Sequence, residues 1–299
     1  MIIKRFTKEW PLHMLLLPGI VIALIFSYVP MAGIAIAFEK FIPTKGIFKS
    51  QWVGWDNFKY MMEYPGMGRI MFNTLYIAIM KIIGGLMVPI TVAILLNEIR
   101  KEVFKRTVQT LVYLPHFLSW VLLGGILIDI LSPTSGIINQ LLGWFGFKPI
   151  FFLGSNAWFP YTLVISDIWK EFGFSTIVYL AALTSINPSL YEAAEMDGAG
   201  RWKQTWHVTL PGMLPIIVLM ATLSVGNILN AGFEQIFNLY GPAVYESGDI
   251  IDTFVYRMGF VQVHYGLATS VGLLKSVVSF VLLSMSYSMA YRFAGYRIF

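Results

Sequence analysis

The 299-residue sequence contains no cysteine and few charged residues. Without a thiol, the chain can form no disulfide, offers no thiol nucleophile and supplies no thiolate to a metal. Only 12% of its residues are charged and 57% are hydrophobic, whereas a soluble domain carries about 25% charged residues. Mean hydropathy is +0.69. Because so little charge is available to solvate a surface, most of the exterior must face lipid, and we expect a single all-α integral membrane unit.

Several chemical signatures are also missing. The sequence has no G-x-x-x-x-G-K-[ST] phosphate loop and neither H-E-x-x-H nor G-x-S-x-G. Its histidines are scattered without metal-ligand spacing: His13, His116, His207 and His264. We therefore expect a non-enzymatic chain that binds no cofactor and no metal. An intramembrane enzyme is the least favoured class of function.

A transmembrane helix needs roughly 20 predominantly apolar residues to cross a bilayer, and six segments meet this requirement. They are residues 12–38, 71–96, 107–131, 159–183, 212–236 and 267–291. The first contains a charge-free run of 28 residues from Pro11 to Phe38. A secretory signal has an apolar region of only about 7–15 residues, so this run is expected to remain as the first span.

Lysine and arginine in the connecting segments predict the orientation. With the N-terminus inside, eleven lie on the inner side, namely Lys4, Arg5, Lys8, Arg100, Lys101, Lys105, Arg106, Arg201, Lys203, Arg292 and Arg297, against six outside, namely Lys40, Lys45, Lys49, Lys59, Lys148 and Arg257. Both termini are thus expected in the cytoplasm. The net charge of +5 reflects these basic loops, and nucleic acid is not an expected partner.

Three outer segments, residues 39–70, 132–158 and 237–266, are expected as loops rich in aromatic residues and glycine, as in WVGWDNF and LLGWFGF. Tryptophan and tyrosine gather at membrane interfaces, so an aromatic belt explains part of this composition. A docking surface for an external partner is the alternative.

The inner loop 184–211 is unusually polar for this chain and includes YEAAEMDGAGRWKQTWHVTLPG, residues 191–212. Asn187 is a good N-cap and Pro188 suits the first helical position, while Gly198 is a typical left-handed stop. These signals predict a short helix over 188–197. A second short segment, with Trp202 and Trp206 on one face, should end at Pro211.

The predicted helix has an almost flat face formed by Leu190, Ala193, Ala194 and Asp197, because residues three and four apart share a helix side and alanine is small. Such a face allows close approach by another backbone. Two interpretations are open: an interfacial connector between spans, or a rigid elbow that docks into a partner.

The spacing within this loop resembles a known family signature. Glu192-Ala193-Ala194, then Gly198 after three residues, and then Val208, Leu210 and Pro211 match the pattern of permease subunits of bacterial binding-protein-dependent ABC importers, except that Val208 replaces the usual isoleucine. The stretches PMAGIAIAFEKF and GFEQIFNLYGPAVY are similar to the carbohydrate-uptake branch, in the subgroup that imports oligosaccharides and complex glycans in Gram-positive bacteria.

This resemblance implies a type I ABC importer permease fold with six transmembrane helices. It implies that the loop is a coupling helix seated on an ATPase, with contacts from Glu192, Ala193, Ala194, Asp197, Gly198, Leu210 and Pro211. It also implies a second homologous permease subunit, two copies of a cytoplasmic ABC ATPase that hold ATP and Mg, an extracellular solute-binding lipoprotein, and an oligosaccharide substrate, including plant-polysaccharide-derived ones. The expected division is an N-terminal region 1–70, a permease core 71–291 and a cytoplasmic tail 292–299.

Charges within the expected spans need a reason, since each costs at least about 2.5–3.5 kcal/mol at bilayer depth. These are Lys81, Asp129, Asp167, Lys170, Glu171, Glu234 and Lys275. Two interpretations are open: ion pairs between spans, or a polar substrate path. The candidate path residues are Trp169, Lys170, Glu171, Asn227, Asn230, Phe233, Glu234 and Asn238. Four of them, Asn227, Asn230, Glu234 and Asn238, are spaced three or four apart and would form one helix stripe of amides and a carboxylate. Trp120 and Tyr240 are further aromatic candidates for contact with sugar rings.

The buried acids leave one alternative function open. Asp167, Glu171 and Glu234 would serve as proton sites in a proton- or ion-coupled secondary sugar transporter. That class is disfavoured because such a carrier has no need for an ATPase-docking loop.

Overall fold

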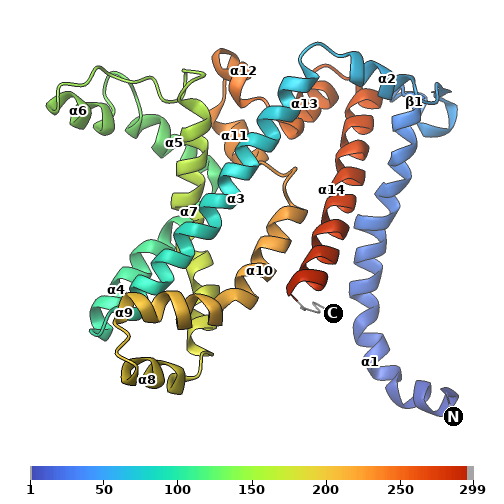
Figure 1. Cartoon of the computed structure of the whole chain (residues 1–299). Coiled ribbons are helices and arrows are strands. Elements are labelled where there is room, and N and C mark those ends of the chain that lie inside the picture. Colours follow the sequence, from blue (N-terminus) through green and yellow to red (C-terminus); the bar gives the residue numbers. More distant parts are fainter. Residues whose placement is uncertain (1, 295–299) are drawn as a thin grey trace. The chain divides into compact units, whose positions relative to one another are not determined.

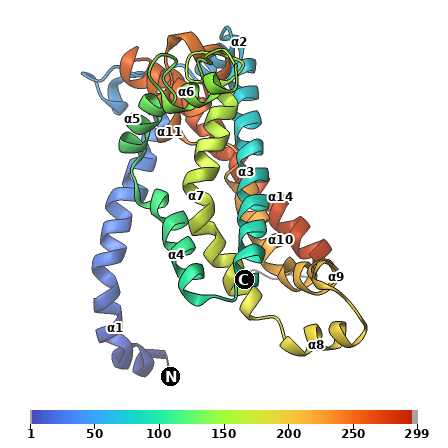
Figure 2. The same cartoon turned by 90° about the vertical axis from the view of Figure 1, so that its left-hand side faces the viewer.

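The structure, a computed structural model, describes residues 2–294 and is almost entirely helical (Figures 1 and 2). It divides into two compact units. The first contains the chain up to Met67 together with Val255–Leu274, and the second contains Gly68–Phe254 together with the chain from Lys275 onwards. Of the expected tail 292–299, α14 includes residues 292–294, and residues 295–299 lie outside the described part of the chain.

The first unit begins with a long, nearly continuous helix. It consists of α1 (Ile2–Ala23), a π-helical turn (Leu24–Tyr28) and a 3₁₀ stretch (Val29–Phe38). A short antiparallel hairpin follows, β1 (Glu39–Lys40) with β2 (Gln51–Trp52), in which Glu39 pairs with Trp52, and α2 (Asp56–Glu63) comes next. The Asn57 side chain donates to the carbonyl oxygens of Ala37 and Glu39, at 2.9 and 3.0 Å, and so joins α2 to the hairpin.

The second unit is a bundle built on α3 (Met67–Glu98) and α7 (Phe159–Thr184). Its other elements are α4 (Glu102–Tyr113), α5 (Trp120–Ile130), α6 (Ile137–Trp144), α8 (Pro188–Met196), α9 (Arg201–Gln204), α10 (Leu210–Gly226), α11 (Phe233–Leu239) and α12 (Tyr245–Gly248). The short α13 (Ile251–Tyr256), a π-helical turn (Arg257–Val261) and α14 (Tyr265–Ala294) complete the described chain.

Two apolar clusters form the core of the second unit. One joins α3, α5, α7 and α11 through residues such as Ile77, Leu123, Leu163 and Ile236. The other joins α3, α7 and α10 through residues such as Ala93, Tyr179 and Met213. These clusters hold together helices that are far apart in the sequence.

Four helical segments of the described chain have the length and composition to cross a membrane: Trp10–Phe38, Met67–Glu98, Arg201–Gly226 and Tyr265–Ser288. They correspond to the first, second, fifth and sixth expected spans. The fourth expected span is α7, which is 26 residues long but carries Asp167, Lys170 and Glu171 in its middle.

The third expected span, residues 107–131, is not one straight helix. Glu102–Phe117 and Trp120–Ile130 meet at a bend of 104°. Pro115 lies in a 3₁₀ turn (Leu114–Phe117) and Leu118 is extended. Proline lacks the N–H that an α-helix interior requires, and Ser119 starts a new helix because its Oγ accepts from the Leu122 N–H at 3.3 Å. The break therefore has a local chemical cause.

The fifth expected span, residues 212–236, is wrong at both ends. One helical segment runs continuously from Arg201 through Pro211 to Gly226. A π-helical turn at Thr205–Thr209 widens the backbone just before Pro211, so this proline is accommodated and does not stop the helix. Residues 227–232 then form an irregular segment, called here the linker, and α11 is a separate helix.

The expected outer loop 237–266 is also largely helical, with α12, α13 and two short helical turns. Ile250, Ile251 and Phe254 are buried. This region is therefore not a solvated loop, and part of it belongs to the packed interior of the second unit.

Candidate functional site

The loop between α7 and α10 folds into a two-helix elbow formed by α8 and α9. Asn187 caps α8, because its Oδ1 accepts from the Ser189 N–H at 3.0 Å, and Pro188 takes the first helical position. Gly198 has φ = +73°, and the Gly198 and Ala199 N–H groups bond back to the Glu195 and Ala194 carbonyls at 2.9 and 2.8 Å. This pair of backbone hydrogen bonds is the Schellman motif, which ends the helix. The predicted helix is confirmed, with Asp197 as its C-cap.

Side-chain contacts attach the elbow to the long helices. The Tyr191 hydroxyl lies 3.0 Å from the buried Oγ1 of Thr209. Arg201 forms an ion pair with Glu98 at the end of α3, with 3.0 Å between Nη1 and Oε2. These contacts attach α8 to the π-helical turn that precedes α10, and α9 to α3.

The elbow protrudes at the end of the second unit opposite α6 and α12 (Figures 1 and 2). Its outward residues are apolar as well as exposed: the exposed fractions are 88% for Met196, 74% for Trp202 and 56% for Trp206. The two indole rings pack edge to face, 6.3 Å apart. Large exposed apolar groups gathered in one place are typical of an interaction site.

The motif residues divide between this surface and the start of α10. Glu192, Ala193, Asp197 and Gly198 are exposed and Ala194 is half-buried. Leu210 and Pro211 are in the first turn of α10 and therefore lie beyond the elbow itself. Of the four residues of the predicted flat face, Leu190, Ala193 and Asp197 are exposed and Ala194 is half-buried.

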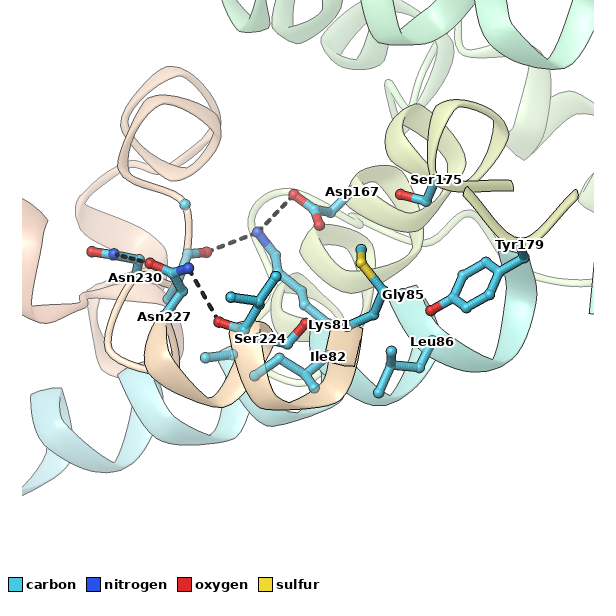
Figure 3. A pocket seen from close by; sticks show the side chains of 15 residues that line it. Lys81, Ile82, Gly85, Leu86, Asp167, Ser175, Tyr179, Ser224, Asn227 and Asn230 are labelled. Atoms are coloured by element: carbon cyan, nitrogen blue, oxygen red, sulfur yellow. Dashed lines mark hydrogen bonds and ion pairs between the residues drawn. The ribbon is translucent and has the colours of Figure 1, made fainter. Parts of the chain in front are cut away.

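A cavity of about 400 Å³ with a mixed polar and apolar lining lies between α3, α7, α10 and the linker (Figure 3). Its polar lining consists of Lys81, Asp167, Ser175, Tyr179, Ser224, Asn227 and Asn230. Two of the predicted path residues, Asn227 and Asn230, are among them. The mixture of amide, hydroxyl and charged groups can offer several hydrogen bonds to a ligand rich in hydroxyl groups.

Lys81 is the most enclosed charge at this cavity. Its side chain is 9% exposed, and Nζ lies 3.1 Å from Oδ1 of Asp167. It also donates to the Ala231 carbonyl at 2.8 Å and to Oε1 of Gln235. Lys81 therefore joins α3 to α7, to the linker and to α11. For this residue and Asp167, the ion-pair interpretation of the intramembrane charges is the one observed.

Lys275 on α14 is paired in a way that the sequence did not indicate. Its Nζ lies 2.5 Å from Oδ1 of Asp252 and donates to Oδ1 of Asn230 at 2.7 Å. Asp252 lies in the segment expected as an outer loop, residues 237–266, and not in an expected span, so the sequence pattern gives no signal that it is the counterion.

A second polar cluster surrounds the bend between α4 and α5. Nδ1 of His116 lies 2.7 Å from Oε2 of Glu171, whose Oε1 lies 2.7 Å from Nζ of Lys170. Lys170 donates further to the His116 carbonyl at 3.0 Å, and the His116 ring stacks on Phe174 with 4.1 Å between centroids. Lys170 and Glu171 thus join α7 to the bend and do not line the cavity.

The predicted stripe along span five does not exist as one helix face. Asn227 and Asn230 belong to the linker, whereas Phe233, Glu234 and Asn238 belong to α11. Gly232 separates them with φ = +97°, a backbone geometry that a continuous helix cannot contain. Only the two linker amides line the cavity.

The remaining candidates have other environments. Glu234 and Asp129 are exposed, and within the described residues neither has an ion-pair partner. Phe233 stacks on Phe237 at 5.3 Å, Trp169 is 44% exposed, and the Trp120 ring lies under Lys170 at 5.5 Å. Tyr179 is the aromatic residue that lines the cavity, and its apolar surroundings in α7 gave no sequence signal for that role.

Comparison with known proteins agrees with this architecture. Residues 85–294 match the family model of the binding-protein-dependent transport system inner membrane component. Protein LplB of Bacillus subtilis is 42% identical over 92% of this chain and 86% of its own length. The polygalacturonan/rhamnogalacturonan transport system permease protein YteP of the same organism is 40% identical over 100% of this chain and 93% of its own length.

Solved structures of similar chains give the same result. A chain of a bacterial ABC transporter involved in the import of the acidic polysaccharide alginate superposes with a TM-score of 0.91 and 38% identity, over 98% of this chain and 99% of the other. A chain from the alginate transporter in complex with an alginate pentasaccharide-bound periplasmic protein gives 0.89 and 39%, over 97% and 96%. A proton- or ion-coupled carrier is therefore excluded as the class of this protein. The chain therefore belongs to the inner membrane components of binding-protein-dependent transport systems, as a permease subunit of an ABC importer.

Proposed function

We propose that this permease carries oligosaccharides, with uronate-containing oligosaccharides foremost, across the cytoplasmic membrane of a bacterium by alternating access. The cavity beside the linker supports this proposal most strongly. Its amides and hydroxyls, together with the Lys81–Asp167 pair, suit a polar ligand with many hydroxyl groups. The named relatives that handle polygalacturonan, rhamnogalacturonan and alginate direct attention to acidic sugars.

In this proposal Asn227 and Asn230 contact the sugar in the state described here. Trp169, Lys170, Glu171, Phe233, Glu234 and Asn238 would belong to the wall of the path in other conformations of the transport cycle. Because they lie outside the cavity lining here, they are weaker candidates for contact with the sugar than the linker amides.

The elbow is the proposed contact with an ABC ATPase. Glu192, Ala193, Ala194, Asp197 and Gly198 would seat α8 in a cleft of the ATPase, and Leu210 and Pro211 would transmit its motion into α10. ATP and Mg would be held by two copies of that ATPase, because this sequence has no phosphate loop of its own. The exposed Met196 and Trp202 supply the apolar area that such a contact would bury.

The remaining arrangement follows from orientation. Both chain termini would lie in the cytoplasm, the side on which the positive-inside rule puts the excess of lysine and arginine. An extracellular solute-binding lipoprotein would deliver the sugar from the other side, and a second homologous permease subunit would complete the pore. The proposed divisions are residues 1–70, the permease core 71–291 with loop 184–211, and the tail 292–299.

Purification of the tagged chain from its native membrane in a gentle detergent tests this assembly. We expect an ATPase, a second permease chain and a lipoprotein to co-purify. The purified complex, reconstituted into liposomes, should take up oligogalacturonides only when ATP is supplied on the elbow side. Uptake by the chain alone, or uptake that persists without ATP and stops when an ion gradient is collapsed, would contradict the proposal.

A further inference from the structure

The linker between α10 and α11 is held by lysines from two other helices of the second unit. Lys81 on α3 donates to the Ala231 carbonyl at 2.8 Å, and Lys275 on α14 donates to Oδ1 of Asn230 at 2.7 Å. Each lysine also has its own carboxylate, Asp167 or Asp252. The linker residues are thus fixed by two charge-assisted hydrogen bonds, which are among the stronger contacts in proteins.

Lys275 determines which way the Asn230 amide points. An ammonium group donates hydrogen bonds and accepts none, so the atom of Asn230 that faces it must be the oxygen. The Nδ2 of Asn230 then faces Oδ1 of Asn227, at 3.3 Å. The Nδ2 of Asn227 in turn donates to the Leu223 carbonyl at 3.3 Å.

These contacts form a chain of hydrogen bonds with a single direction, from Lys275 through Asn230 and Asn227 to a backbone carbonyl. Hydrogen bonds in such a series polarise one another. The positive charge at the start of the chain therefore makes the remaining N–H groups of both amides better donors. Both asparagines line the cavity, and Lys275 does not.

The charge itself is not offered to a ligand. The Lys275 side chain is 16% exposed and already paired with Asp252. Its influence on the cavity is therefore indirect, through the orientation and polarisation of the two amides. Lys81, the cation that does line the cavity, is neutralised by Asp167.

We infer that Lys275 is a positioning residue that presents the Asn230 and Asn227 amides to the cavity as hydrogen-bond donors for an acidic sugar. This inference rests on the proposed function. A carboxylate is ionised and accepts hydrogen bonds about twice as strong as those to a neutral ester or hydroxyl oxygen, so it gains more from a wall of fixed N–H donors than an ester or a hydroxyl does. The alternative role for Lys275 is solely to neutralise Asp252.

The test compares uptake of a trigalacturonide with uptake of its methyl ester by the complete reconstituted importer. The variant is Lys275→Met/Asp252→Asn, which removes both partners of the pair and leaves no unpaired carboxylate. The matched control is Arg69→Met/Glu246→Gln, which makes the same change in charge at an exposed pair with 2.8 Å between its atoms. We expect the KM for the acid to rise about 10-fold in the variant, the loss of roughly one charge-assisted hydrogen bond. The KM for the ester, and the maximal uptake rates for the acid and for the ester, should change by less than about 3-fold, because the ester does not lose a charge-assisted hydrogen bond.

Two further variants separate orientation from charge neutralisation. Lys275→Arg preserves a donor-only group and should retain the preference for the acid. Lys275→Gln should lose it, because a glutamine amide can turn either atom toward Asn230, and this variant serves if the double variant does not assemble. Equal changes in KM for acid and ester, or an unchanged preference in Lys275→Gln, would overturn the inference. No uptake of either sugar by the wild-type importer would instead refute the proposed function.

Discussion

The Tyr191 hydroxyl of α8 and the Thr209 hydroxyl at the start of the α10 region meet at 3.0 Å. Thr209 is buried, whereas most of α8 is exposed. This contact joins a protruding surface helix directly to a helix that crosses the membrane. In the proposed function, this contact would transmit movement of the elbow to that helix.

We predict that Tyr191→Phe weakens coupling without preventing assembly. One hydroxyl contact of this kind contributes about 0.5–1.5 kcal/mol, too little to unfold the chain. The number of sugars taken up per ATP hydrolysed should fall, and Thr209→Val should have the same effect. The double variant should be no worse than either single variant, because both remove one shared contact. Additive losses would show that the two side chains act separately.

Gly198 requires a left-handed backbone, with φ = +73°. Proline is restricted to φ near −65°, so Gly198→Pro should leave the protein inserted in the membrane and abolish ATP-driven uptake. Gly200→Ala is the control, because Gly200 has φ = −68° and open space around its α-carbon. Membrane content by immunoblot and uptake in vesicles measure the two effects. Wild-type uptake by Gly198→Pro would show that the elbow geometry is not needed.

The Lys81–Asp167 pair is largely buried, with side-chain exposures of 9% and 25%. Lys81→Met leaves Asp167 without a counterion, and the loss of one partner of a buried pair costs about 3–5 kcal/mol. We expect a clear fall in the thermal unfolding temperature of the purified complex. Lys81→Met/Asp167→Leu should recover most of that loss, because no charge is left unpaired. A double variant as unstable as the single one would mean that Lys81 acts chiefly through Ala231 and Gln235.

Glu234 and Glu171 form a comparison between two acids of the expected spans. Glu234 is exposed and has no ion-pair partner among residues 2–294, whereas Glu171 contacts His116 and Lys170 at 2.7 Å each. Glu234→Gln should change stability by less than about 0.5 kcal/mol, as is usual for a surface position. Glu171→Gln should lower it by about 1 kcal/mol, the net contribution of one hydrogen bond. The reverse order in unfolding temperature would refute both assignments.

Gly173 marks the closest approach of α7 to α4. A β-carbon at this position would overlap the backbone carbonyl of Val112, so Gly173→Ala must separate the two helices. We expect poor assembly of the importer, although alanine is the better helix former by about 1 kcal/mol. Gly125→Ala in α5 is the matched control, since a β-carbon there meets nothing within 4 Å. Normal assembly of Gly173→Ala would show that the α4–α7 contact tolerates displacement.

Local chemistry made two features predictable from the residues alone. The membrane class follows from a charged fraction of 12%, because no other solvent than lipid suits such a surface. The elbow follows from Asn187, Pro188 and Gly198, whose capping and turning roles depend on neighbours only a few residues away. The motif around Glu192 was recognisable for the same reason, since its spacing is a property of one short segment.

Tertiary structure alone decided how the spans break and which charges meet. A hydropathy average over 20 residues is insensitive to a single backbone angle, so the turn at Gly232 and the bend before Ser119 were hidden. The partner of Lys275 proved to be Asp252, 23 positions away, in a segment whose composition resembled a loop. The cavity has the same origin: its amides, Lys81 and Tyr179 come from three separate parts of the chain, and only the packing of α3, α7 and α10 brings them together.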